Sequence, residues 1–291
     1  MTNMTLSQPA VRLMAWKEHA PWLVAAVAGV ALFWQPFVTL GRDWWSDPDA
    51  GHGLLLFPVA LWLGWRRGLA PDSRPQPTFG LVLLMLAVVL RYLSGLAAEL
   101  FTMRLSMLGA LAAVIVFAWG WRQLLHWWLP AALLVLSVPI PAVVLGSLAL
   151  PLQLKASQLG ATLLAARHVP VLLTGNIIHL PGHSLFVTEA CSGLRSLTAL
   201  LSLGVLIGGL WLRMPWTRIA VVALAVPVAM ALNAIRVFLT GFLVYFVNPG
   251  LADGFMHYTE GWVLFVVAFV ILGGLAWTMS RLETLRLRPA S

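Results

Sequence analysis

The stretch RIAVVALAVPVAMALNAIRVFLT, residues 218–240, is almost wholly apolar and contains no acidic residue. A helix of this length crosses a bilayer, because about 20 residues span the ~30 Å hydrocarbon layer. Similar runs recur along the 291 residues, and the chain is 60% hydrophobic and 10% charged, with a mean hydropathy of +0.90. These values exclude a soluble globular domain. The sequence therefore predicts an all-α integral membrane protein.

Hydropathy predicts a polytopic helical bundle of about eight transmembrane helices. The expected spans are 21–40, 52–65, 78–97, 105–121, 125–146, 193–212, 218–240 and 261–279. One transmembrane domain, 21–280, then lies between a cytoplasmic N-terminal segment (1–20) and a cytoplasmic basic tail (281–291). The first twenty residues lack the short apolar core of a cleaved secretory signal, so the first span is expected to remain in the mature protein.

The net charge of +8 is spread over short loops, which favours membrane topology over nucleic-acid binding as its explanation. With both termini inside, the inner segments hold Arg12, Lys17, Arg66, Arg67, Arg74, Arg122, Arg213, Arg218, Arg281, Arg286 and Arg288. The outer segments hold Arg42, Arg104, Lys155, Arg167 and Arg195. The positive-inside rule therefore places both termini in the cytoplasm. Arg91 falls within a span, and an ion pair with Glu99 is one structural role open to it.

The long outer segment before the 193–212 span has two parts. Residues 147–169 repeat apolar positions at helical spacing, which predicts a short extracytoplasmic helix along the membrane surface. Two β-rich stretches follow, joined at 180–183 by Leu-Pro-Gly-His, which fits a type II turn. We expect this β-hairpin to bring Cys191 to the membrane surface.

Cys191 is the only cysteine, and it stands where the 193–212 helix is expected to begin. The positive end of a helix dipole favours a thiolate, which is the reactive form. Arg236 is expected near the outer end of its span, where it would stabilise an oxyanion, and His257 in the next outer loop would act as acid and base. Glu260 or Asp253 would orient His257. The alternatives are a packing cysteine, a snorkelling arginine and an interfacial histidine.

The outer histidines also raise the alternative of a metal site. Its ligands would come from His52, His179, His183 and His257 together with Asp47 or Asp49. None of these has the helical spacing that sets two imidazoles on one metal ion. The sequence therefore predicts no metal and no cofactor.

Four sequence blocks resemble those of the exosortase/archaeosortase family of membrane transpeptidases. They are WSDPDAGHGLLLFPVALWLGWRR (45–67), ACSGLRSL (190–197), NAIRVFLTG (233–241) and H-x-x-x-G-W (257–262). The blocks occur in the family's order, in a chain of the expected size. One departure is Gly51, where the family commonly has serine.

The resemblance implies that Cys191 is the nucleophile, Arg236 the stabilising arginine and His257 the acid/base residue. Supporting candidates are Arg195, Asn233, Glu189 and His52. The family acts in the bacterial inner membrane on exported proteins with a C-terminal sorting signal, which comprises a Pro-Glu-Pro-type motif, a transmembrane helix and a basic tail. It cuts near the motif and is thought to pass the new carboxyl end to a surface acceptor, such as a lipid or polysaccharide. The extra C-terminal domain of some members is not expected here.

A different class of function is a transporter or lipid-binding membrane protein for an anionic ligand, with Arg91, Arg236 and the outer histidines along its path. The inverted repeats and paired broken spans common in such folds are not apparent. A structural membrane subunit is a third hypothesis. Loss of processing on Cys191→Ala would distinguish the enzyme from both.

Overall fold

The computed structural model describes residues 8–47, 49–187, 194–247 and 255–286. Its helices are α1 (Gln8–Ser46), α2 (Gly53–Arg67), α3 (Pro77–Leu96), α4 (Leu100–Trp119), α5 (Trp121–His126), α6 (Trp128–Leu136), α7 (Ala142–Ala165), α8 (Leu194–Trp211), α9 (Pro215–Phe246) and α10 (Phe255–Arg286). The helical membrane class is therefore confirmed. Because α1 begins at Gln8 and α10 continues to Arg286, helices extend into both terminal segments expected at 1–20 and 281–291.

Five helical stretches in the described residues are long and apolar enough to cross a membrane alone. They are Leu23–Ser46, Pro77–Leu96, Leu100–Trp119, Pro215–Phe246 and Val263–Arg286. The apolar part of α8, Leu197–Trp211, is shorter, and α2 has 15 residues. That the chain crosses the membrane eight times remains a prediction.

The prediction of one continuous span at 125–146 is wrong. That stretch contains the end of α5, all of α6, an irregular segment and the start of α7. Pro139 and Pro141 explain the break after α6, because proline lacks the N–H that a continuing helix requires. Trp44 uses the freed backbone, since its Nε1 donates to the carbonyl oxygen of Ser137 at 2.7 Å.

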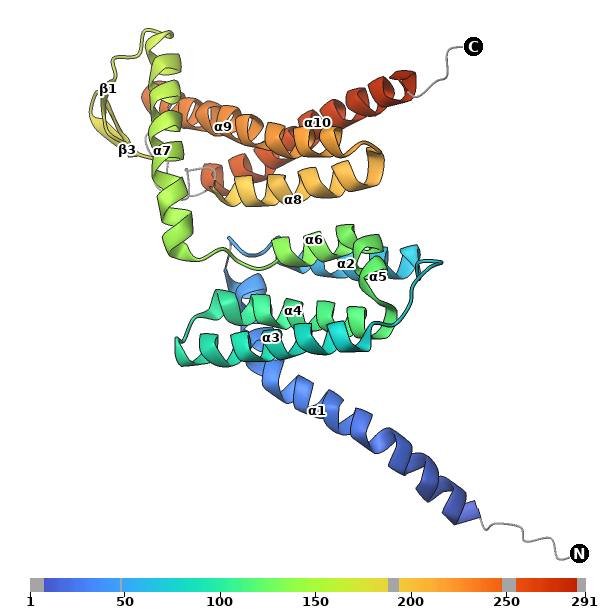
Figure 1. Cartoon of the computed structure of the whole chain (residues 1–291). Helices are drawn as coiled ribbons and strands as arrows, with labels where there is room; N and C mark the ends of the chain where they lie inside the picture. The colour runs from blue at the N-terminus through green and yellow to red at the C-terminus, as the bar shows by residue number, and fades with distance from the viewer. Residues whose placement is uncertain (1–7, 48, 188–193, 248–254, 287–291) are drawn as a thin grey trace, which may run out of the picture.

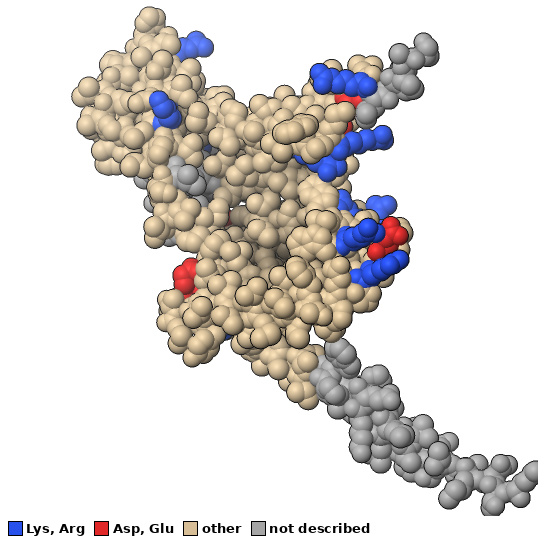
Figure 2. All heavy atoms as spheres, viewed as in Figure 1, with Lys and Arg blue, Asp and Glu red and all other residues tan. Residues whose placement is uncertain are grey.

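Figure 1 shows two groups of helices, α1–α6 and α7–α10. Helices α2, α4, α8 and α10 run toward one end of the molecule, whereas α3, α6 and α9 run the other way. Positive side chains gather at the first end, and most of those visible lie along this edge (Figure 2). We call it the arginine end, defined by Arg66, Arg67, Arg74, Arg122, Arg213, Arg218, Arg281 and Arg286. The opposite end is the sheet end.

Helix α7 lies across the direction of α8–α10 at the sheet end (Figure 1). After it come β1 (Leu172–Thr174), β2 (Ile177–Leu180) and β3 (His183–Phe186), an antiparallel sheet in the order β1-β2-β3. The hairpin expected here corresponds to β2 and β3, with β1 as an additional strand. Gly182 has a φ of 79°, which the third position of a type II turn requires.

Glycines let the helices approach closely where the groups meet. A Cβ atom on Gly160 of α7 would lie 2.5 Å from Cγ1 of Val237 on α9. A Cβ on Gly209 of α8 would lie 2.5 Å from Cδ1 of Leu129 on α6. Small residues at such crossings are typical of membrane helix packing. The second contact joins the two helix groups.

The interpretation of Arg91 as a partner of Glu99 is wrong. Arg91 Nε donates to the Leu32 carbonyl oxygen, and its Nη2 donates to Gln35 Oε1, both at 3.1 Å. Glu99 instead caps α4, where its carboxylate accepts from the backbone N–H of Thr102 at 2.7 Å. The helix start therefore uses the carboxylate locally.

Candidate functional site

Arg236 and Asn233 lie on one face of α9 and line a cavity of about 50 Å³ at the junction of α8, α9 and α10. Asn233 is buried and Arg236 is half-buried. The remaining lining residues are Leu200, Ala229, Leu232, Leu264, Phe265 and Ala268. A cavity of this size has room for a few water molecules. A peptide would therefore have to bind at its mouth, with at most one small polar group inside.

Apolar packing fixes the three helices around this cavity. Leu200, Ala225, Leu232, Ala268 and Leu272 form one buried cluster with contributions from α8, α9 and α10. Sequence reasoning predicted Arg236 and Asn233 but not the residues of α8 and α10 beside them. Those residues are ordinary apolar side chains, so the sequence holds no signal that would distinguish them.

The two helices that face Arg236 both begin at the sheet end of the group (Figure 1). Helix α8 begins at Leu194, so its first residue is about 9 Å along the axis from Leu200 at 1.5 Å per residue. In α10, His257 precedes Leu264 by about 10.5 Å on the same measure. The backbone of His257 and the start of α8 therefore stand at similar heights beyond the cavity.

Several predicted residues fall outside the described structure. Cys191 and Glu189 belong to the segment 188–193, which is not described. Arg195 and His257 lie on α8 and α10, but their side chains are outside the described part. Their roles remain predictions.

Helix α9 is longer than the expected 218–240 span, and the position of Arg236 near the outer membrane surface remains a prediction. The helix continues ten residues past Arg236 to Phe246, about 15 Å at 1.5 Å per residue. This part is covered by α7 and the sheet, because Gly241 faces Leu164 and Leu185. The covering elements permit the extension, since the outer part of α9 packs against protein.

His52 belongs to the other helix group and does not line this cavity. It precedes α2, and its Nε2 lies 3.2 Å from the Leu136 carbonyl oxygen. Burial lowers the pKa of His52 from its ordinary value of 6.5, and the bond to Leu136 and the charge of Asp49 oppose this only in part. A neutral imidazole that donates to Leu136 fits these surroundings, which gives His52 a structural role between α2 and α6.

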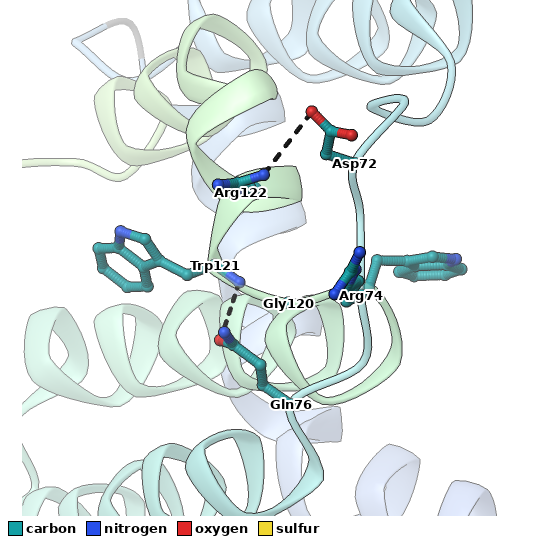
Figure 3. Close-up of a pocket in the computed structure, with 7 residues that line it drawn as sticks. Asp72, Arg74, Gln76, Gly120, Trp121 and Arg122 are labelled. Carbon is teal, nitrogen blue, oxygen red and sulfur yellow. Dashed lines mark hydrogen bonds and ion pairs between the residues drawn. The ribbon is translucent and has the colours of Figure 1, made fainter.

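A second cavity, of about 350 Å³, lies at the arginine end (Figure 3). Its lining is Asp72, Arg74, Gln76, Trp119, Gly120, Trp121 and Arg122. Arg122 points to Asp72, with Nη1 and Oδ2 separated by 3.6 Å, and Gln76 Oε1 accepts from the Trp121 N–H. It contains none of the predicted catalytic residues.

The fold thus defines a polytopic helical membrane protein with a polar-edged cavity among its last three helices. A family model described as transmembrane exosortase (Exosortase_EpsH) matches residues 44–274, which is most of the chain. The chain belongs to the transmembrane exosortase family, which confirms the resemblance seen in the four sequence blocks. Membership indicates a membrane protein-sorting transpeptidase. No curated protein and no solved structure matches the chain.

Proposed function

We propose that this chain is a membrane-embedded cysteine transpeptidase that cleaves the C-terminal sorting signals of exported proteins. One observation supports it most: Arg236 and Asn233 line a cavity walled by α8 and α10. Helix α8 begins three residues after Cys191, and α10 contains His257 in its first turn. The proposal therefore assigns Cys191, Arg236 and His257 to one shared site at this three-helix group.

The proposed reaction begins with the Cys191 thiolate. Its sulfur attacks the scissile carbonyl carbon, and the carbonyl oxygen takes the electron pair as an oxyanion stabilised by Arg236. The C–N bond then breaks, and the imidazolium of His257 gives its proton to the departing amine. The product is a thioester between Cys191 and the new carboxyl end.

The second half resolves the thioester. An acceptor nucleophile, or water, gives a proton to His257 and attacks the thioester carbonyl, and the thiolate of Cys191 leaves. Transfer to a surface lipid or polysaccharide joins the exported protein to that acceptor. Hydrolysis releases it.

Substrate orientation follows from charge. By the positive-inside rule the arginine end is expected in the cytoplasm, and Cys191 would then act on the extracytoplasmic side of the inner membrane. A substrate helix with a cytoplasmic basic tail then runs parallel to the bundle. Its Pro-Glu-Pro-type motif would stand at the extracytoplasmic surface, level with Cys191.

The test uses a reporter protein with such a sorting signal, co-expressed with the enzyme and followed by its change in size. Cys191→Ala should abolish processing, and Arg236→Gln should slow it by about 10²- to 10³-fold, the usual effect of losing one oxyanion donor. The matched control is Arg167→Gln, which removes an exposed cation beyond α7 and should leave the rate unchanged. Processing that survives Cys191→Ala at the wild-type rate would refute the proposal.

A further inference from the structure

Trp128 makes cation–π contacts with two arginines at the seam of the two helix groups. The guanidinium carbon of Arg67, the last residue of α2, is 5.8 Å from the Trp128 ring centroid. The guanidinium carbon of Arg218, in the first turn of α9, is 5.0 Å from the same centroid. All three side chains are half-buried. The two cations are therefore at most about 11 Å apart, roughly one Debye length at 0.1 M salt.

Neither charge is paired with a carboxylate among the described residues, in contrast to the ion pairs of Arg104 and Arg122. Glu283 is the acidic residue that attracts Arg218, but at longer range than an ion pair. Its oxygens accept from the backbone N–H groups of Arg213 and Met214, at 2.9 and 3.0 Å. Glu283 thus caps the start of α9, and the arginine pair keeps an excess of positive charge.

Both guanidinium groups retain donors for a ligand. Arg67 Nη1 donates to the His126 carbonyl oxygen at 3.0 Å, and Arg218 Nε donates to the Leu212 carbonyl oxygen at 2.9 Å. A guanidinium carries five N–H donors, and in the described part of the chain the others have no protein acceptor. The backbone bonds hold each group in place. The free edges suit the oxygens of a phosphate.

Tryptophans near the pair indicate the depth of the lipid headgroups. Tryptophans are enriched where a membrane helix meets the aqueous interface. The exposed tryptophans near the arginine end are Trp62, Trp65, Trp121, Trp211, Trp216 and Trp277. Trp127, the neighbour of Trp128 in sequence, donates its Nε1 hydrogen to the Gly68 carbonyl oxygen and adds a further tryptophan at this end.

We infer that Arg67 and Arg218 bind the phosphodiester of an anionic phospholipid at the seam between α1–α6 and α7–α10. Basic pockets between membrane helices on the cytoplasmic side are suited to acidic headgroups. The phosphate would offset the repulsion between the two cations, and the acyl chains would lie along the apolar seam. The lipid would thereby hold the two helix groups together at the arginine end. This site is separate from the cavity at Arg236.

The test is a titration of the purified full chain, in zwitterionic micelles, with phosphatidylglycerol or phosphatidylcholine, read by native mass spectrometry and thermal unfolding. The double variant Arg67→Gln/Arg218→Gln should bind phosphatidylglycerol at least tenfold more weakly than the wild type. The matched control, Arg66→Gln/Arg213→Gln, removes two exposed cations of the same end and should change the affinity less than threefold. Equal weakening in both double variants would overturn the inference, because general surface charge would then explain the binding.

Two further arms complete the test. If the double variant does not fold, the single variants Arg67→Gln and Arg218→Gln test the inference in its place. Each should weaken phosphatidylglycerol binding at least threefold, and wild-type affinity in both would overturn the inference. Inorganic phosphate at millimolar concentration should not raise the unfolding temperature. Stabilisation by phosphate equal to that by phosphatidylglycerol would assign the site to a soluble anion and reject the lipid.

Discussion

Replacing Gly160 with alanine tests how α7 is seated on α9 beside Arg236. The new methyl group would lie 2.5 Å from Cγ1 and 3.0 Å from Cβ of Val237, the residue that follows Arg236. Valine is β-branched and stiff at χ1, so it cannot turn away cheaply. The two helices would have to separate, and the covering of the Arg236 segment would loosen.

The expected cost follows from two opposing terms. Overpacking of this kind typically destabilises by about 1–3 kcal/mol, whereas exchanging glycine for alanine inside a helix gains up to about 1 kcal/mol. A Cβ atom on Gly146 of the same helix would have no atom within 4 Å, so Gly146→Ala isolates the helix-propensity gain. The difference in free energy of unfolding between the two variants should be about 1–3 kcal/mol, with Gly160→Ala the less stable.

The assay is denaturant unfolding in detergent micelles for both variants, followed by the rate of reporter processing. Gly160→Ala should also slow processing, because its clash lies next to Arg236, while Gly146→Ala should not. Equal unfolding free energies for the two variants would refute the close contact of α7 with α9.

Three other perturbations test separate parts of the fold. Gly209→Ala sets a methyl group 2.5 Å from Leu129 Cδ1 and should lower the unfolding temperature; an unchanged temperature would contradict the seam packing. Glu99→Ala removes the cap of α4 and should cost about 1 kcal/mol in denaturant unfolding, whereas no loss would show that the cap is dispensable. Burial lowers the pKa of His52 in the folded chain, so the unfolded chain binds a proton first as pH falls through 6.5. Stability should therefore fall as the pH drops through 6.5, less steeply in His52→Gln; identical slopes would count against this.

Apolar runs and prolines made much of the helix pattern predictable. Helices α3 and α9 begin at Pro77 and Pro215, close to the expected starts, because proline is tolerated in the first turn. The errors arose where hydropathy carries no information about backbone breaks or covering elements. Residues 125–146 are apolar throughout much of their length, yet Pro139 interrupts the helix. The extension of α9 depends on α7, which packs on it from elsewhere in the sequence.

The candidate site, like the fold, could be predicted from the sequence only in part. Arg236 was predictable because a charged group inside an apolar span is costly unless it has a role, whereas Asn233 was a candidate through the family resemblance. The residues of α8 and α10 that line the cavity could not be predicted, because only folding brings Leu200 and Leu264 beside Arg236. The arginine pair on Trp128 was missed for a similar reason, because Arg67, Arg218 and Trp128 lie on three different helices and the sequence shows the two arginines only as topology signals.

The most direct test of the central claim measures the reactivity of Cys191, which is the only thiol in the chain. A membrane-impermeant maleimide is applied to spheroplasts across a pH series, in the wild type and in the variants Arg236→Ala and His257→Ala. We expect rapid labelling with an apparent pKa below the ~8.5 of an ordinary thiol, raised in both variants. Absence of labelling even in detergent, or the same profile in all three proteins, would contradict a nucleophilic Cys191 coupled to Arg236 and His257.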